Sequence, residues 1–146
     1  PEATMPITES PDTVLQQGSA RASILLAHGS SDPHWLAPFD VLLSQIREAM
    51  GANGCRTELA YMELAEPSLS AQVNTLAAEG ISSIDILPLF FAAGRHLRRD
   101  VPVMIEALQQ ELESAGTPVS IQLHSPVGLE PEVATAISQV VQRKLR

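Results

Sequence analysis

The segment Ile86–Pro102 reads ILPLFFAAGRHLRRDVP, and it determines how the rest of the chain is interpreted. It begins with an apolar run rich in branched and aromatic residues, which is typical of a buried strand. The run breaks at two alanines and Gly94, and one histidine, His96, follows among three arginines. An aspartate and a proline then open a helical pattern. The segment therefore predicts a strand that ends in a turn carrying a potential metal ligand and an anion-binding group.

A second segment, Ile24–Pro33, has the same organisation and reads ILLAHGSSDP. A short apolar strand is followed by His28 and Gly29, and then by small polar residues. Glu63 follows another expected strand, in the sequence YMELAEPS. Ligands of open parallel sheets bind beyond the carboxyl ends of the strands, where the strand order reverses. We therefore expect His28, Glu63 and His96 to meet at one edge of a sheet, where the two histidines form a metal site.

Apolar periodicity predicts four strands that alternate with four helices. The expected strands are Ala22–Ala27, Thr57–Met62, Ser83–Phe91 and Val119–Leu123. The expected helices contain the apolar residues spaced between Phe39 and Met50, Leu69 and Ala77, Met104 and Leu112, and Val133 and Leu145. Four such units in series predict an α/β fold with a four-stranded parallel sheet and helices on both faces. A flavodoxin-like strand order would make the first and third strands neighbours and place His28 beside His96.

Length and composition limit the class of protein. A chain of 146 residues suits one domain, which we assign to residues 21–146. Pro1–Ala20 is polar, holds three prolines and is expected to be a disordered tail. The formal net charge of −8 argues against a nucleic-acid partner, which would require a basic face. No apolar run approaches the roughly 20 residues that cross a bilayer, and the N-terminus lacks the pattern of a secretory signal. We expect a soluble cytoplasmic protein without a membrane partner.

Three of the eight arginines, Arg95, Arg98 and Arg99, stand within five residues of one another. Guanidinium groups bind carboxylates through paired hydrogen bonds, so this cluster favours a polyanionic substrate over a solvated turn. Ser30, which follows the His-Gly pair of the first segment, is assigned to the same substrate site.

Several polar residues also have a purely structural explanation. Glu63 could be a surface charge beside a helix start, and Asp32 and Asp100 are expected to cap the helices that follow them. The residues with no further mark of function are His34, His124 and the single cysteine, Cys55. One cysteine excludes an intramolecular disulfide, and we expect this thiol to be inert.

The sequence lacks the motifs of nucleotide chemistry. No GxGxxG follows the first strand, no GxSxG occurs, and the only lysine is Lys144, so there is no P-loop. We therefore expect no nucleotide cofactor. A histidine phosphatase would also place a histidine after the first strand, but it requires arginine where Ala27 stands.

The segments LLAHGSSDP, AYMELAEPSL and LPLFFAAGRHLRRDVP together resemble the small CbiX/SirB type of class II chelatase. The resemblance runs in order and spacing from about Ala22 to the C-terminus, and GRHLRRDVP is its most specific part. It implies a flavodoxin-like chelatase fold and ATP-independent insertion of Co²⁺, Fe²⁺ or Ni²⁺ into sirohydrochlorin, in cobalamin or sirohaem biosynthesis. Ser31 stands where arginine is common in the family, which removes a possible contact to a substrate carboxylate.

The resemblance also implies roles for the matching residues. His28 and His96 bind the metal and present it to one face of the macrocycle, while Glu63 or a histidine accepts the pyrrole protons. The arginine cluster holds peripheral carboxylates. A single-domain chain is expected to pair as a homodimer whose cleft places apolar helical surface opposite the two histidines. The alternative is a carrier of metal or tetrapyrrole that uses the same histidines without turnover.

Overall fold

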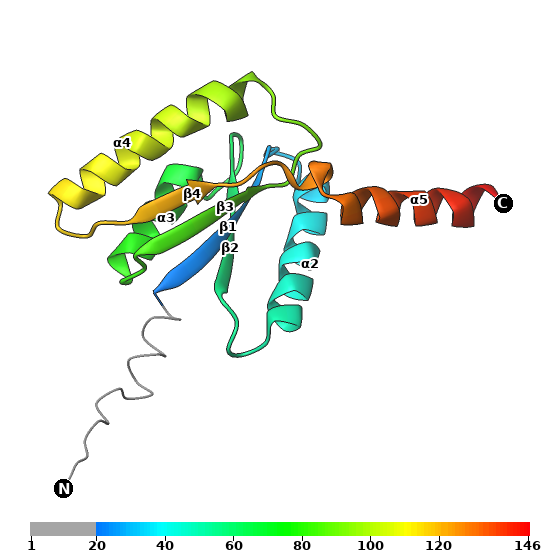
Figure 1. The fold of residues 1–146 in the computed structure, drawn as a ribbon, viewed down its shortest axis with the longest axis horizontal. Helices are drawn as coiled ribbons and strands as arrows, with labels where there is room; N and C mark the ends of the chain where they lie inside the picture. The colour runs from blue at the N-terminus through cyan, green and yellow to red at the C-terminus, as the bar shows by residue number, and fades with distance from the viewer. Residues whose placement is uncertain (1–19) are drawn as a thin grey trace, which may run out of the picture.

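The computed structural model describes residues 20–146. The tail expected over Pro1–Ala20 therefore lies outside the described residues, apart from Ala20. The described chain forms a four-stranded parallel sheet in the order β2-β1-β3-β4 (Figure 1), which confirms the flavodoxin-like arrangement. No helix in the described range is both long enough and apolar enough to cross a membrane.

The strands and helices alternate as the periodicity predicts. The strands are β1 (Arg21–Ala27), β2 (Arg56–Tyr61), β3 (Ser83–Pro88) and β4 (Ser120–Leu123). The α-helices are α2 (Pro33–Met50), α3 (Leu69–Ala78), α4 (Val101–Ser114) and α5 (Pro131–Leu145). Two short helical turns complete the chain: η2 (His96–Asp100), a π-helical turn that leads into α4, and η3 (Val127–Leu129), which precedes α5. The third strand ends at Pro88 and not at Phe91, because its partner β1 has already ended at Ala27.

Side chains on one face of the sheet, which we call the core face, form the main hydrophobic core. Ile24 and Leu26 of β1 and Ile86 of β3 are completely buried there. They pack against the apolar sides of α3 and α4, from which Val73 and Val101 are at most 1% exposed. The period of two along each strand sends the intervening side chains to the opposite face.

The opposite face is covered only in part. Helix α2 lies on this side, over β2, and its N-terminus is capped as predicted by Asp32, whose carboxylate accepts the backbone N–H of His34 at 2.9 Å. Helix α5 extends away from the sheet (Figure 1), and none of its residues is buried. The sequence therefore predicts the helices correctly, but not that one of them stands clear of the sheet.

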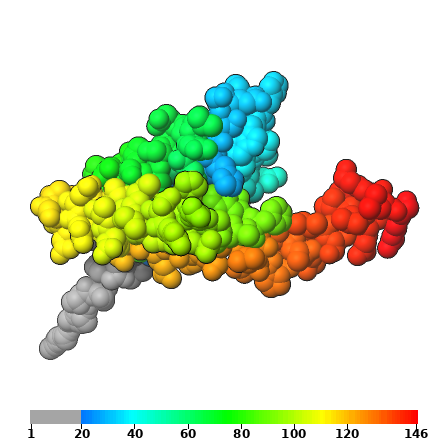
Figure 2. Space-filling model, turned by 90° about the horizontal axis from the view of Figure 1, so that it is seen from above, coloured from blue at the N-terminus to red at the C-terminus, as the bar shows by residue number. Residues whose placement is uncertain are grey.

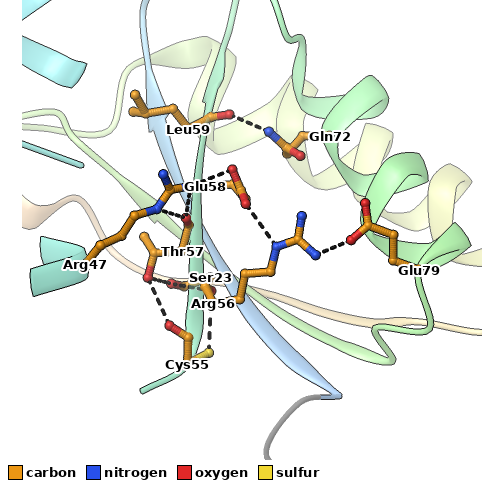
Figure 3. A network of polar contacts seen from close by, with 9 residues as sticks. All are labelled: Ser23, Arg47, Cys55, Arg56, Thr57, Glu58, Leu59, Gln72 and Glu79. Atoms are coloured by element: carbon orange, nitrogen blue, oxygen red, sulfur yellow. Dashed lines mark hydrogen bonds and ion pairs between the residues drawn. The ribbon is translucent and has the colours of Figure 1, made fainter. Parts of the chain in front are cut away.

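The edge strand β2 is held to both neighbouring helices by side chains that bind its free backbone carbonyls (Figure 3). The guanidinium of Arg47 in α2 donates to the carbonyl of Thr57 at 2.8 and 3.1 Å. The amide of Gln72 in α3 donates to the carbonyl of Leu59 at 2.8 Å. Edge strands carry backbone groups without a strand partner, and these side chains satisfy two of them.

An ionic cluster joins the same strand to the end of α3. Arg56 donates to Glu58 at 2.9 Å and also binds Glu79, which follows the last residue of α3 (Figure 3). The hydrogen bond to Glu79, and then that to Glu58, raises the pKa of the Arg56 guanidinium. The cluster is partly exposed, so it fixes the position of α3 more than it adds to stability.

Gln72→Ala should lower the free energy of unfolding by about 1–3 kcal/mol, because it leaves the carbonyl of Leu59 buried without a partner. Gln72 itself is only 8% exposed. The matched control is Asn74→Ala on the exposed side of α3, which should change stability by less than about 0.5 kcal/mol. Urea unfolding measures both variants, and equal effects would contradict the role given to Gln72.

Candidate active site

A pocket of about 440 Å³ opens beyond the carboxyl ends of β1, β2 and β3. Its lining residues are His28, Met62, Glu63, Phe90, Ala92, Ala93, Gly94, Arg95, His96 and Leu97. The structure thus brings both strand-terminal histidines and the glutamate to one pocket. This arrangement follows from the strand order, because β1 lies between the other two strands.

His28 is supported by an aromatic side chain that the sequence analysis did not single out. Its imidazole stacks on the ring of Phe90, with ring centroids 4.1 Å apart and an angle of 25° between the planes. Phe90 is only 7% exposed and belongs to the core, so it forms a fixed platform under an exposed histidine. His28 lines the pocket from this platform.

Gly29 allows the loop after β2 to approach the loop after β1. It has a φ of +99°, and a Cβ atom at this position would lie 1.8 Å from the carbonyl oxygen of Glu63. The backbone N–H of Glu63 donates to the carbonyl of His28 at 3.1 Å. Only glycine permits both this conformation and this contact. The His-Gly pair therefore places Glu63 beside His28.

His96 begins the π-helical turn η2 and is paired with Asp100. Its Nδ1 lies 2.6 Å from Oδ2 of Asp100, one helical turn further on. The prediction that Asp100 caps the following helix is wrong, since it makes no capping hydrogen bond. The helix already begins at His96, so the backbone of Asp100 is helical (φ −77°, ψ −41°) and lacks the extended conformation of a cap.

The arginine cluster divides between the pocket and the surface. Arg95 lines the pocket, whereas Arg98 and Arg99 are exposed in η2 and do not line it. None of the three forms an ion pair within residues 20–146. Ser30 also lies outside the lining residues, and its hydroxyl accepts the backbone N–H of Asp32 at 3.0 Å.

Apolar side chains surround the polar groups of the pocket. The apolar residues of the lining are Met62, Phe90, Ala92, Ala93 and Leu97. Leu64 and Phe91, which follow Glu63 and Phe90 in the sequence, are each 68% exposed. A second pocket of about 160 Å³ adjoins the first, and Met62 and His96 line both. The site is therefore a wide surface with apolar walls and a few polar groups, the kind of surface that suits a large flat ligand.

The site is not a closed metal cage. Over residues 20–146, no three histidine, cysteine, aspartate or glutamate side chains are grouped closely enough to hold a metal ion. Cys55 lies outside the pocket, and burial raises the pKa of its thiol, which keeps it protonated and unreactive. His34 is exposed on α2, and His124 pairs with Asp85 at 2.8 Å, so neither joins the pocket.

Comparison with known proteins places the chain among chelatases. The CbiX family model matches residues 22–144. The chain is 28% identical to the sirohydrochlorin cobaltochelatase of Sulfurisphaera tokodaii over 123 residues, which cover 84% of this chain and 92% of the relative. A sirohydrochlorin cobaltochelatase of Saccharolobus solfataricus is 28% identical over 116 residues, or 78% of this chain and 88% of the relative.

Solved structures show the same fold. A CbiX protein from Marinobacter aquaeolei VT8, named for cobalamin (vitamin B12) biosynthesis, is 44% identical with a TM-score of 0.73, covering 86% of this chain and 97% of that one. The sirohydrochlorin chelatase SirB from Bacillus subtilis subspecies spizizenii, in complex with cobalt, is 20% identical with a TM-score of 0.68. The match covers 84% of this chain and 50% of SirB.

Gly29→Ala should destabilise the protein more than Gly80→Ala does. Both glycines have positive φ values, +99° and +95°, so each alanine carries the conformational cost of about 1–2 kcal/mol. A Cβ at Gly80 would meet nothing within 4 Å, whereas at Gly29 it would collide with the Glu63 carbonyl. The collision should add roughly 1–3 kcal/mol. Denaturant unfolding of the two variants measures the difference. Equal losses in the free energy of unfolding would show that the loop carrying Glu63 moves away from the added methyl group at no cost.

Proposed function

The chain belongs to the CbiX family, and we propose that it inserts a divalent metal ion into sirohydrochlorin without a nucleotide. The observation that carries this proposal is the single pocket that contains His28, Glu63 and His96 between apolar walls. The two relatives named sirohydrochlorin cobaltochelatase support the substrate, and they favour Co²⁺ as the metal. Insertion of Fe²⁺, as in sirohaem biosynthesis, is the alternative use of the same site.

The metal ion is a substrate that must be bound and then released to the macrocycle. In our proposal His28 and His96 bind it, because neutral imidazole nitrogens suit Co²⁺, Fe²⁺ and Ni²⁺. Two imidazoles leave several coordination positions to water, and water can be replaced by pyrrole nitrogens one at a time. A cage of thiolates would hold the ion too tightly for transfer, and the thiol of Cys55 lies outside the pocket.

Metal insertion also requires the macrocycle to lose two protons. Glu63 is proposed as the proton acceptor, because its loop is held against the backbone of His28 at the same pocket. A carboxylate can accept a proton from a pyrrole nitrogen and return it to water. A histidine released from the metal during ligand exchange is the alternative acceptor.

The tetrapyrrole would lie on the apolar walls, with its carboxylates directed toward cationic groups. Arg95 is the arginine at the pocket itself, and we assign it the closest carboxylate. Arg98 and Arg99 would bind carboxylates that extend past the rim, since both are exposed on the adjoining turn. Ser30 is assigned to the same substrate surface, next to the loop that carries His28.

Asp100 is proposed as a positioning residue for His96. The 2.6 Å contact at Nδ1 allows the imidazole to donate its proton there, which leaves Nε2 as the free ligand atom. Carboxylates that accept a hydrogen bond from a metal-binding histidine fix both its tautomer and its ring orientation. This contact supports a metal-binding role for His96 over a solvated position.

We also propose that residues 21–146 act as one CbiX-like domain that pairs with a second copy. The pocket is partly open to solvent, while a flat macrocycle needs a wall on each side to be shielded from water. Closed two-fold pairing is the commonest way for a small domain to obtain a second wall. The residues before Ala20 are expected to contribute nothing essential to this pairing.

His96→Ala should lower the rate of metal insertion at least about 100-fold, because it removes a direct ligand. The assay follows the absorbance change when protein, sirohydrochlorin and Co²⁺ are mixed, above the uncatalysed rate. His34→Ala is the matched control, since His34 is exposed and lies outside the pocket. A wild-type protein that binds metal or tetrapyrrole but never exceeds the uncatalysed rate would be a carrier, and the chelatase proposal would be wrong.

Asp100→Ala should raise the Michaelis constant for the metal about 10–100-fold and leave that for the tetrapyrrole nearly unchanged. This split separates a positioning role from general damage to the pocket. Glu113→Ala is the control, because it removes the same charge from an exposed position at the far end of α4. Equal changes in both constants would contradict the assignment.

A further inference from the structure

Helix α5 has no adequate packing partner within the described chain. It spans 15 residues, none of them buried, and its main contact is with the short turn η3 that precedes it. Figure 2 shows it as an arm that stands clear of the body. Isolated helices of this length are marginally stable in water, so most of the stability of such a helix must come from packing. The structure therefore leaves a folded helix without a surface to support it.

The sequence of α5 is that of a helix built to pack on an apolar surface. Its large apolar residues recur at helical spacing along one side: Val133, Ile137, Val140, Val141 and Leu145. Ile137, Val140 and Val141 are 40–46% exposed, and Leu145 is 79% exposed. Thr135 and Gln139 lie on the opposite side of the helix. A single apolar side with polar residues opposite predicts one partner surface.

The face of the sheet opposite the core is left partly uncovered over β3 and β4, where Leu87 lies among polar residues. Leu87 lies in β3 with a strand on each side, yet its side chain is only half-buried. Gln122 in β4, on the same face, is exposed. The inner residues of α2 are likewise half-buried: Leu36, Phe39, Leu42, Leu43 and Ile46. Parallel sheets are normally covered on both faces, and no described helix covers this face over β3 and β4. We call this area, represented by Leu87 and Gln122, the open face.

We propose that α5 of one copy packs on the open face of a second copy, beside the α2 helix of that copy. Each chain carries both halves of the contact, so a two-fold axis would generate two identical contacts and satisfy both chains. The turn before α5 favours packing of this helix on a second copy over packing on its own chain. The N–H of Gly128 donates to the carbonyl of Phe90 at 2.8 Å, and a Cβ there would lie 2.4 Å from Cα of Phe91. This anchored turn directs α5 outward.

The distribution of charge also favours packing of α5 on a second copy of the chain. Three of the nine cationic side chains of the chain stand at the end of α5: Arg143, Lys144 and Arg146. Residues 21–129, which form the body that would receive the helix, hold six arginines and twelve carboxylates, a formal net charge of −6. The open face itself carries Asp85, which already pairs with Arg21 at 3.4 Å and His124 at 2.8 Å. A basic helix end on an acidic body is attracted to a second copy of that body.

This inference gives the proposed pairing a defined surface, and it does not depend on the chelatase reaction. The first test is light scattering after gel filtration on the full chain and on Ile137→Asp/Val141→Asp. The wild type should be a dimer and the double variant a folded monomer, because the altered residues are exposed in one copy. Its circular dichroism should lose at most the helical signal of α5, which would then have no packing partner. Thr135→Asp/Gln139→Asp adds the same charges at the same spacing on the polar side and should remain a dimer.

The second test identifies the surface directly. A Gln122→Cys chain and an Ile137→Cys chain, both carrying Cys55→Ser, are co-expressed and treated with a bis-maleimide crosslinker. A covalent pair with one chain of each kind is expected, and replacing Ile137→Cys by Gln139→Cys should greatly reduce it. A wild-type monomer, a dimer that survives Ile137→Asp/Val141→Asp, or the absence of a crosslink between the Gln122→Cys and Ile137→Cys chains would each overturn the exchange. None of these results would affect the insertion assay, so the two proposals can fail separately.

Discussion

Parallel pairing of β1 with both β2 and β3 is the constraint on which the site depends. Leu26 lies opposite Ala60 on one side and Pro88 on the other, so the three strands reach the same level of the sheet. The loops that follow these strands therefore begin side by side and extend beyond the same edge of the sheet. A histidine, a glutamate and a histidine-bearing turn are thereby brought to one pocket from three distant parts of the sequence. A different strand order would separate them.

The fold and the meeting of these side chains were predictable because both follow from repeated, local signals. Each apolar strand is followed by a helical pattern, and glycines such as Gly51 end the helices where the pattern stops. The strand order then places the ends of the first and third strands together without any knowledge of side-chain contacts. What the topology could not supply is support for the imidazoles. The stacking of His28 on Phe90 depends on which ring of an apolar run faces the pocket, and a run of hydrophobic residues does not specify that.

Two further features lay beyond the sequence for different physical reasons. An aspartate that precedes an apolar helix can cap that helix or contact a side chain one turn earlier. Which of the two it does depends on the residue at which the helix begins. The polar turn His96–Asp100 has no apolar periodicity to mark it as helical, so the contact of Asp100 with His96 remained hidden. The direction of α5 away from its own sheet could not be predicted, because an amphipathic pattern does not show whether a helix packs on its own chain or on another one.

The pocket and the turn before α5 are connected through one backbone contact. Gly128 holds the turn before α5 against Phe90 and Phe91, and Phe90 is the platform under His28. Phe90 therefore contacts both the turn that leads into α5 and the imidazole of His28. Metal transfer requires few protein ligands and an accessible ion. With so few ligands, the orientation of each metal-binding histidine has to be fixed by its neighbours. Packing of α5 on a second copy would hold the turn that contacts Phe90, and so restrain the ring under His28. It would add no ligand to the metal ion, so dimer formation would not slow the exchange of metal ligands.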